Sequence, residues 1–429
     1  METKSITAIQ NYLNKQGSEF LTSDIPLTNN LHISIVIPCF NEPDVLQTLE
    51  SICLCRGFTC GVEVILLINT FVDTPAAIAA LNEKTYTSAL AFAQENNRQD
   101  FSIIPLHIKN LPSKFAGVGL PRKIGMDEAL RRFVRLGKGE GLLVCLDADC
   151  MVQENYIAEI EHQFKTDKKC VALSIQFHHL VEHLEENDPL RRAAIQYEIY
   201  LRYYQMALAY IGYPYPFYTI GSAIAVRAIV YAKVGGMGKQ AAGEDFYFMQ
   251  KIFPAGKVIF LSATCVFPAA RYSNRVLFGT GPALKELSAT NEIVKKTYCL
   301  ESFAMLKILF ADVGKFFVSE KDQIQSTINA YPKALQEFLS NDSFLVNLWE
   351  IRSNTSDLAS FTKRFFRYFN ALKIIQFLNF SHSPSPSQYF QLSAVCQECH
   401  KLLNLHREED KLFLSDYDLY EFLYDNITI

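Results

Sequence analysis

The segment Ile33-Ser-Ile-Val-Ile-Pro-Cys-Phe-Asn-Glu42 decides the fold class of this chain. Its first half is a compact run of β-branched residues, which is typical of a buried strand, and its proline marks the turn that ends the strand. Helix-forming residues follow from 44 to 53. A strand that leads through a polar turn into a helix is the opening of a βαβ unit.

The same alternation continues toward the C-terminus. Residues 62–68 form a second apolar run, and helical sequence follows over 75–96. A third strand is expected at 101–108, a helix at 121–136 and a fourth strand at 142–146. Strands that alternate with helices predict an α/β fold, Rossmann-like, with a mostly parallel sheet flanked by helices.

The alternation ends after three further strands, which we expect at 171–177, 223–226 and 258–261. Beyond about residue 282 the pattern is helical and rich in Phe and Leu. We therefore predict three parts, which are an N-terminal arm over 1–30, an α/β domain over 31–282 and a helical C-terminal domain over 283–429.

The composition is that of an ordinary globular protein. Of the 429 residues, 49% are apolar and 20% are charged, which excludes collagen-like, disordered and small disulfide-stapled proteins. Lys and Arg number 41 against 45 Asp and Glu, so the net charge is −4. This balance does not favour a polyanion-binding surface, and we expect no nucleic-acid partner.

The chain is expected to be cytoplasmic. It starts Met1-Glu-Thr-Lys4, without the apolar segment of a secretory signal. The longest uncharged stretch, 203–226, is long enough to span a bilayer, but its prolines, glycines and tyrosines favour a helix end, a loop and a strand. The cysteine count of 11 is odd, which fits reduced thiols in the cytoplasm.

An acidic pair follows the fourth expected strand, in the sequence Asp147-Ala-Asp149. Two carboxylates at i and i+2 of an extended segment point to the same side, so a cation is expected between or beside them. Mg²⁺ and Mn²⁺ prefer oxygen ligands and commonly bridge a carboxylate to substrate phosphates. The sequence therefore predicts a divalent-metal site with Asp149 and Asp147 as ligands.

Polar residues also follow the first two strands. Asn41 and Glu42 come after the first strand, and Asn69 comes after the second. Each alone fits a helix cap, but open parallel sheets bind ligands in the crevice at the carboxyl ends of their strands. Three polar strand ends together favour a binding site there.

Glu244 and Asp245 open an amphipathic helical run behind Gly243. One interpretation is a favourable charge at a helix N-terminus, and the other is a general base that faces an acceptor hydroxyl. Arginines suit phosphate recognition, and Arg122 precedes the acidic pair while Arg271 and Arg275 follow the last expected strand.

Taken together, these motifs resemble family-two glycosyltransferases. The resemblance covers roughly residues 31–280, well over half of the chain. The segments that carry it are, in order, Ile33–Glu42, Leu143–Asp149, Gly221–Arg227, Val234–Met237 and Gly243–Asp245. It implies a GT-A type fold and the transfer of a sugar from a nucleoside-diphosphate sugar to an acceptor hydroxyl, usually with inversion.

The resemblance also implies roles for single residues. Asp245, beside Glu244, would be the catalytic base, and Asp149 with Asp147 would hold Mn²⁺ or Mg²⁺. The residues expected to bind the nucleotide sugar are Pro38, Asn41, Glu42, Asn69, Arg122, Asp147, Arg271 and Arg275.

The chain departs from the family pattern at three places, one of which is Pro121-Arg122-Lys123, where the family usually has Ala-Arg-Asn. Asn69 stands where the family usually has an acidic residue, and this difference affects recognition of the nucleobase. Arg271 and Arg275 stand where a histidine metal ligand often follows the last strand. These arginines could hold the diphosphate and partly replace the charge of the metal.

Three other functions stay open for the same residues. They are a retaining transferase, a nucleotidyltransferase and a binding module without activity. The acceptor is not identified by the sequence, and both a glycan and a lipid-linked acceptor fit. Residues 363–369 interleave basic and aromatic side chains at helical spacing. One interpretation is a core helix whose Lys and Arg stems extend to the surface, and the other is a helix face that lies on the inner side of an anionic membrane. We favour the core helix.

Overall fold

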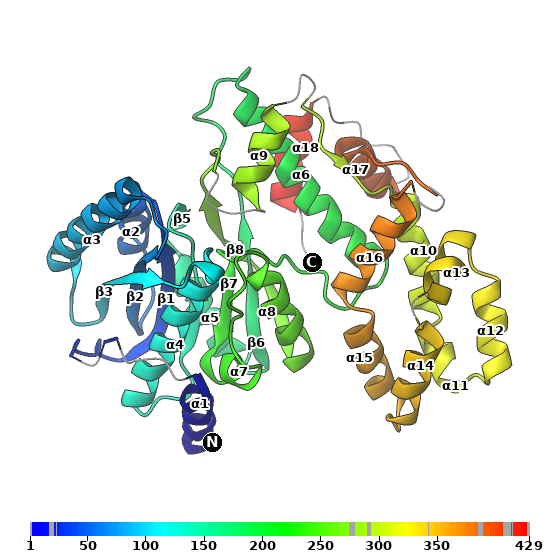
Figure 1. The fold of residues 1–429 in the computed structure, drawn as a ribbon, viewed down its shortest axis with the longest axis horizontal. Helices are drawn as coiled ribbons and strands as arrows, with labels where there is room; N and C mark the ends of the chain where they lie inside the picture. Colours follow the sequence, from blue (N-terminus) through cyan, green and yellow to red (C-terminus); the bar gives the residue numbers. More distant parts are fainter. Residues whose placement is uncertain are drawn as a thin grey trace. The chain divides into compact units, whose positions relative to one another are not determined.

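The computed structural model describes residues 2–16, 21–22, 24–273, 279–289, 293–341, 343–384, 389–405, 413 and 415–426. Its internal contacts divide the chain into two compact units (Figure 1). The sheet unit comprises residues 1–185 and 219–286, and the helical unit comprises residues 186–218 and 287–427. The domain boundaries expected at residues 30 and 282 stay predictions.

The sheet unit is built on an eight-stranded sheet with the order β3-β2-β1-β4-β7-β6-β8-β5. β1 runs parallel to β2 and β4, β2 to β3, and β6 to β8, whereas β7 and β5 run antiparallel to their neighbours. The strands are β1 (Leu31–Cys39), β2 (Gly61–Phe71), β3 (Phe101–Leu111), β4 (Leu142–Cys145), β5 (Cys150–Val152), β6 (Cys170–Phe177), β7 (Ile224–Arg227) and β8 (Lys257–Pro268). This confirms the expected α/β class with a mostly parallel sheet.

Burial explains why these strands were recognisable. All eleven residues of β2 are buried, and all of β1 except His32 are buried, as in parallel sheets covered on both faces. Every strand expected from the sequence is present, although β8 extends well beyond the expected 258–261. β5 is an addition of three residues directly after Asp149, too short to show a pattern.

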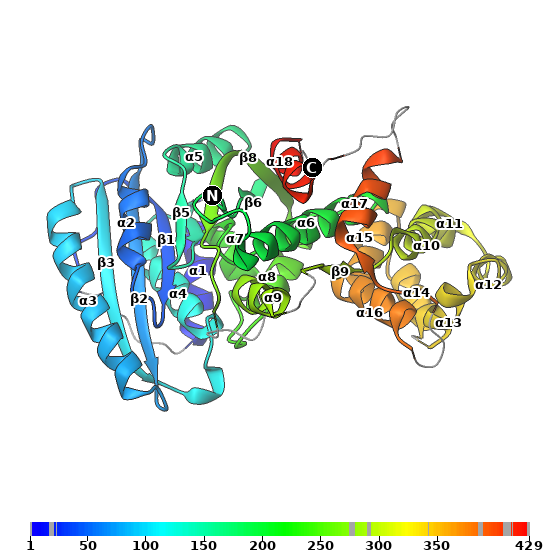
Figure 2. The same cartoon turned by 90° about the horizontal axis from the view of Figure 1, so that it is seen from above.

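Helices cover this sheet. α3 packs on β2 and β3, α4 on β1 and β2, α5 on β8, and α2 on β5 (Figure 2). α1 packs on α4 and α7. The helices are α1 (Glu2–Gln16), α2 (Val45–Cys53), α3 (Ala76–Asn96), α4 (Gly119–Arg135), α5 (Tyr156–Thr166), α7 (Ala228–Lys233), α8 (Glu244–Ile252) and α9 (Thr280–Ser288).

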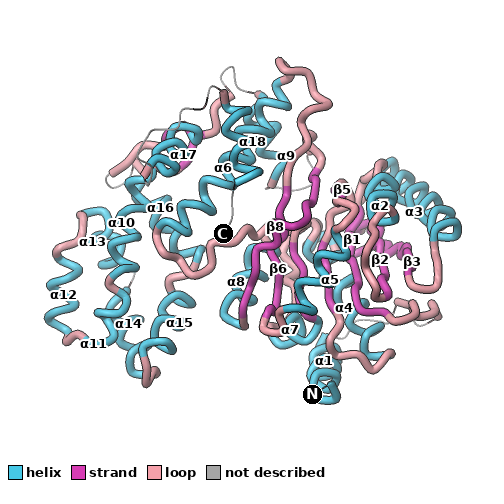
Figure 3. Tube along the Cα trace, turned by 180° about the vertical axis from the view of Figure 1, so that it is seen from behind, coloured by secondary structure: helices cyan, strands magenta, loops and turns pink. Residues whose placement is uncertain are grey.

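The helical unit confirms the helical pattern expected after residue 282 (Figure 3). It also contains α6, which packs on α10, α17 and α18. Its helices are α6 (Pro189–Tyr210), α10 (Leu300–Ala311), α11 (Val313–Val318), α12 (Lys321–Asn329), α13 (Lys333–Asn341), α14 (Phe344–Ser353), α15 (Leu358–Tyr368), α16 (Ala371–His382), α17 (Val395–Asn404) and α18 (Asp416–Asn426). The short strands β9 (Lys296–Thr297) and β10 (Ser393–Ala394) pair antiparallel.

The basic and aromatic segment 363–369 lies in α15 and the turn after it. Phe365 and Phe366 are buried, and their rings meet Phe310 of α10 edge to face. The charged side chains of this segment are exposed. This is the arrangement that the core-helix interpretation predicts, because the apolar face is already covered by the unit itself.

The stretch 203–226 contains the end of α6, a loop and most of β7, as expected. Within the described residues, none of the helices combines the length and the apolar character that crossing a bilayer requires.

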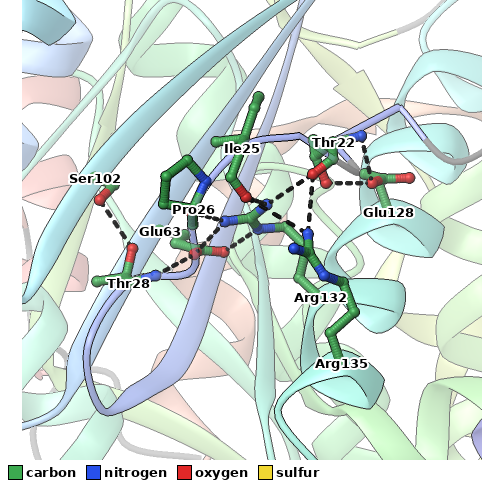
Figure 4. Close-up of polar contacts among 9 residues, drawn as sticks. All are labelled: Thr22, Ile25, Pro26, Thr28, Glu63, Ser102, Glu128, Arg132 and Arg135. Carbon is green, nitrogen blue, oxygen red and sulfur yellow. Dashed lines mark hydrogen bonds and ion pairs between the residues drawn. The ribbon is translucent and has the colours of Figure 1, made fainter.

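The segment before β1 is held to the sheet by hydrogen bonds to the buried ion pair of Arg132 and Glu63 (Figure 4). Arg132 of α4 donates to both carboxylate oxygens of Glu63 in β2, at 2.6 and 2.7 Å, and both side chains are fully buried. The same guanidinium donates to the carbonyl oxygen of Pro26 at 2.7 Å, and Glu63 accepts from the backbone N–H of Thr28 at 3.0 Å. The segment thereby satisfies charges that the sheet buries.

We predict that Arg132→Met lowers the free energy of unfolding of the sheet unit by about 3–5 kcal/mol, because Glu63 would then be a buried carboxylate without its cation. Differential scanning calorimetry measures the change. The control is Lys257→Met, which removes the exposed partner of Asp167 and leaves the unfolding midpoint unchanged. Equal, small shifts in both variants would contradict the prediction.

Candidate active site

The polar residues expected at the strand ends gather at one edge of the sheet. Pro38 lies near the end of β1, opposite Leu67 of β2, and Asn41 and Glu42 follow directly. Asn69 lies inside β2, two residues before its end. β1 is parallel to β2 on one side and β4 on the other, so the turn after β4 opens at the same edge.

Arg122 joins the separate parts of the site. It lies in the first turns of α4, its side chain is 2% exposed, and its Nη2 donates to Oδ1 of Asp147 while its Nη1 donates to Oε1 of Glu244. Burial by itself lowers the pKa of this guanidinium, but Asp147 and Glu244 outweigh burial and raise that pKa overall. The arginine therefore stays charged and ties the turn after β4 to the start of α8.

Gly221 makes room for this arginine. A Cβ at Gly221 would lie 2.6 Å from Nη1 of Arg122 and 2.9 Å from Cζ, closer than real Cβ atoms approach. The backbone N–H of Gly221 also supports the Asp245 carboxylate and favours its charged form. Any side chain at this position would push the guanidinium out of place.

Glu244 and Asp245 have different surroundings although they are adjacent. Glu244 is 2% exposed and bound to Arg122, whereas Asp245 is only partly covered and accepts from the backbone N–H of Phe246 at 2.7 Å. Burial raises the pKa of both carboxyl groups, and each group also feels the negative charge of Asp147. Asp245 is therefore the acidic residue that a ligand can reach, and Glu244 is the one that holds Arg122.

Arg271 provides the second cation of the site. Its Nη2 lies 2.9 Å from Oδ2 of Asp149, and its Nη1 donates to Oε1 of Glu42 at 3.0 Å. A second contact joins Nη2 to Oε2 of Glu42, whose side chain is fully buried. Burial lowers the pKa of Arg271, but Glu42 and Asp149 raise it overall. Glu42 thus orients Arg271 in this structure. Arg275 lies outside the described residues.

Two residues that the sequence did not single out fix the strand ends. Asn82 of α3 accepts from the backbone N–H of Asn41 at 2.9 Å and donates to the backbone oxygen of Asn69 at 2.8 Å. Thr48 of α2 donates to the backbone oxygen of Ala148 at 3.0 Å. Both side chains are buried, and the one signal in the sequence was a polar residue on the inward face of a helix.

Asn69 offers an unused amide. Its side chain is 1% exposed, and neither its amide nitrogen nor its amide oxygen has a hydrogen-bond partner among the described residues. A buried polar group without a partner is costly, so such a group in a ligand crevice indicates a place where a ligand supplies the missing partner.

The acidic pair fits a metal that is shared with a substrate. The side chains of Asp147 and Asp149 are 37% and 26% exposed, so both can be reached from solvent. In the described part of the chain, neither belongs to a close group of three potential ligands. Mg²⁺ is usually held by one or two carboxylates together with substrate phosphates, and these two residues match that donor set.

Comparison with known proteins gives only distant similarity. No family model matches the chain, and no curated protein matches it. Among solved structures, S. aureus TarS residues 1–349 is similar at 11% identity and a TM-score of 0.38, over 79% of this chain and 92% of that one. The complex of that protein with UDP-GlcNAc gives 13% identity and 0.38, and its complex with UDP gives 11% and 0.36, over the same shares. Similarity this weak carries no conclusion about the activity of this chain.

The packing of Gly221 against Arg122 leads to a prediction. Gly221→Ala should displace the guanidinium and lower the free energy of unfolding of the sheet unit by about 1–3 kcal/mol, because overpacking a filled site has that cost. Thermal unfolding measures the change. Gly314→Ala is the control, since among the described residues no heavy atom outside its own helix backbone and chain neighbours lies within 4 Å of a Cβ at that position. A Gly221→Ala protein as stable as this control would show that the site accommodates the methyl group.

Proposed function

We propose that the chain is a glycosyltransferase that moves a sugar from a nucleoside-diphosphate sugar to an acceptor hydroxyl, with inversion. The observation that carries the proposal is the buried Arg122, which holds Asp147 and Glu244 together beside Asp245 at the carboxyl edge of the sheet. In this proposal Arg122 holds Asp147, which would face the donor, near Asp245, which would face the acceptor.

The donor would lie across the ends of β1, β2 and β4, close to Pro38. The free amide of Asn69 can hydrogen-bond to the edge of a nucleobase, because it offers one donor and one acceptor group. Arg271 is half-buried and faces Asp149, so its guanidinium can turn to the diphosphate and bind it bidentately. Charge on the leaving group is then stabilised where it develops.

Asp149 and Asp147 would hold Mn²⁺ or Mg²⁺ together with the diphosphate. Such an ion supplies further neutralisation of the departing nucleoside diphosphate. Since Arg271 now pairs with Asp149, donor binding that draws Arg271 to a phosphate would free this carboxylate for the ion.

Asp245 would act as the general base. The acceptor oxygen forms a bond to the anomeric carbon, the bond from that carbon to the diphosphate oxygen breaks, and the acceptor proton passes to Asp245. Glu244 would keep Arg122 in place. One base facing one donor site is consistent with a single displacement, which inverts the anomeric centre.

The acceptor in this proposal is a glycan or a lipid-linked molecule that the enzyme meets in the cytoplasm or at the inner face of a membrane. The exposed basic residues of α15, Lys363, Arg364 and Arg367, would supply the membrane contact through charge alone. Cosedimentation with anionic vesicles at low and high salt tests this contact, because electrostatic binding weakens as salt rises.

The proposal as a whole is tested by thermal shift with nucleoside diphosphates, with and without Mn²⁺. A ligand at a hundredfold excess over its Kd stabilises the protein by about 2.7 kcal/mol. Binding without hydrolysis or transfer of any donor sugar would indicate a binding module instead, and no binding at all would contradict the proposal.

For the metal, we predict that Asp149→Asn weakens Mn²⁺-dependent binding of UDP or GDP by at least about tenfold, because a ligand of the ion is lost. Isothermal titration with Mn²⁺ and with EDTA measures the difference. Asp44→Asn is the matched control, since this exposed carboxylate lies 3.8 Å from Arg271 and is not expected to hold the ion. Unchanged binding in Asp149→Asn would exclude Asp149 as a ligand.

For the base, we predict that Asp245→Asn lowers turnover about 10²- to 10⁴-fold and leaves the Kd of the nucleoside diphosphate largely unchanged. Burial raises the pKa of Asp245. As the pH falls, its carboxylate is therefore protonated, and lost as a base, at a higher pH than an exposed aspartate is. Wild-type turnover should therefore rise with pH above the usual aspartate range, and Asp245→Asn should lack this rise. If Glu244→Gln removes it instead, the two roles are reversed.

A further inference from the structure

The hydroxyl of Tyr12 lies at the centre of a buried polar network behind the site. Tyr12 belongs to α1 and is 6% exposed. Its hydroxyl donates to Oδ1 of Asp127 at 2.8 Å and accepts from Nζ of Lys123 at 2.7 Å. Lys123 also donates to Oδ2 of Asp127 at 2.8 Å, and the Tyr231 hydroxyl donates to Oδ1 at 3.0 Å. Every polar group named here has a partner in this network.

This network joins α1 to α4, the helix that carries Arg122. Lys123 directly follows Arg122, and Asp127 lies one turn further along the same helix. Successive residues of a helix are turned by about 100°, so Arg122 faces Asp147 and Glu244 while Lys123 faces α1. If Lys123 loses a partner and the first turns of α4 shift, the backbone of Arg122 moves with them, because Arg122 is the preceding residue of the same helix.

The same hydroxyl also bounds the segment that leads into α8. A Cβ at Gly236 would lie only 2.0 Å from the Tyr12 hydroxyl oxygen, so the backbone there rests directly on the tyrosine. The backbone oxygen of Gly236 accepts from Nζ of Lys251 at 2.8 Å, and Lys251 lies in the last turn of α8. α8 begins with Glu244 and Asp245, so its two ends are set by Arg122 and by the Gly236 segment.

We propose that Tyr12 is a positioning residue for the reaction, which fixes Arg122 through Lys123 and fixes α8 through Gly236. The proposal rests on the proposed function, because it assigns Tyr12 to the geometry between Arg122 and the base. The N-terminal helix is accordingly part of the active-site support, although it touches none of the reacting groups.

The test is Tyr12→Phe, which removes the hydroxyl and keeps the ring. Turnover of a donor from a panel of UDP- and GDP-linked hexoses should fall by about 10- to 100-fold, since small misplacements of catalytic groups have effects of that size. The Kd of UDP or GDP should change by less than turnover does, since the four hydrogen bonds of the network involve none of the residues proposed to bind nucleotide and the network acts on Arg122 only through the α4 backbone. Hydrogen exchange should rise in residues 235–245.

Ile9→Ala is the matched control. Ile9 is fully buried on the same helix but carries no polar group, so this variant loosens the packing of α1 and leaves the hydroxyl network intact. It should lower the melting temperature at least as much as Tyr12→Phe while keeping turnover. A Tyr12→Phe protein that loses melting temperature but keeps wild-type turnover and exchange would overturn the proposal, since Tyr12 would then only stabilise the unit.

A second variant covers the case that Tyr12→Phe folds poorly. Lys251→Met breaks the contact with Gly236 from the other side and leaves the route through Lys123 intact, so it should lower turnover by no more than Tyr12→Phe does, with unchanged nucleotide Kd. The double variant should be no worse than Tyr12→Phe alone, because Tyr12→Phe already removes the support that acts through the Gly236 segment. Additive losses would overturn the shared route. A wild-type protein that binds no nucleoside diphosphate would refute the proposed function, and the exchange of residues 235–245 separates that outcome from failure of the Tyr12 linkage.

Discussion

A single buried guanidinium holds the candidate site together. Taking the charge of Arg122 out of water costs several kcal/mol, and only close carboxylates can offset that cost. Asp147 and Glu244 provide them from two segments that are far apart in the sequence. With Asp245 close by, the carboxylates outnumber this cation. Burial raises the pKa of Glu244 and of Asp245, and the negative charge of Asp147 raises both further.

The same principle recurs along α4. Arg122 reaches the site, Lys123 pairs with Asp127 beside α1, and Arg132 pairs with Glu63 of the sheet. Because the residues of α4 are buried on nearly every side, each face of the helix must satisfy its own charges. α4 therefore not only covers the sheet but also connects the sheet, the N-terminal helix and the candidate site.

The sheet was predictable because its strands are buried on both faces and show as continuous apolar runs, most clearly in β2. The structure of β5 was not predictable, since three residues give no periodicity. The assignment of α6 to the helical unit was also not predictable from the sequence pattern. Its sequence indicates a helix wherever it lies, and only its packing on α17 and α18 assigns it to the helical unit.

The candidate site was predictable at the strand ends and not at its supports. Asn82 and Thr48 act through backbone atoms of distant residues, which no local pattern reveals. The different surroundings of Glu244 and Asp245 were not predictable from the local pattern either, because both are acidic residues in the first turn of a helix. Adjacent residues of a helix point in directions about 100° apart, so the carboxylate of Glu244 points inward to Arg122 and that of Asp245 is partly exposed. A carboxylate that neutralises a buried cation is not free to take a proton from an acceptor, so the proposed division of roles rests on burial and on the position of Arg122.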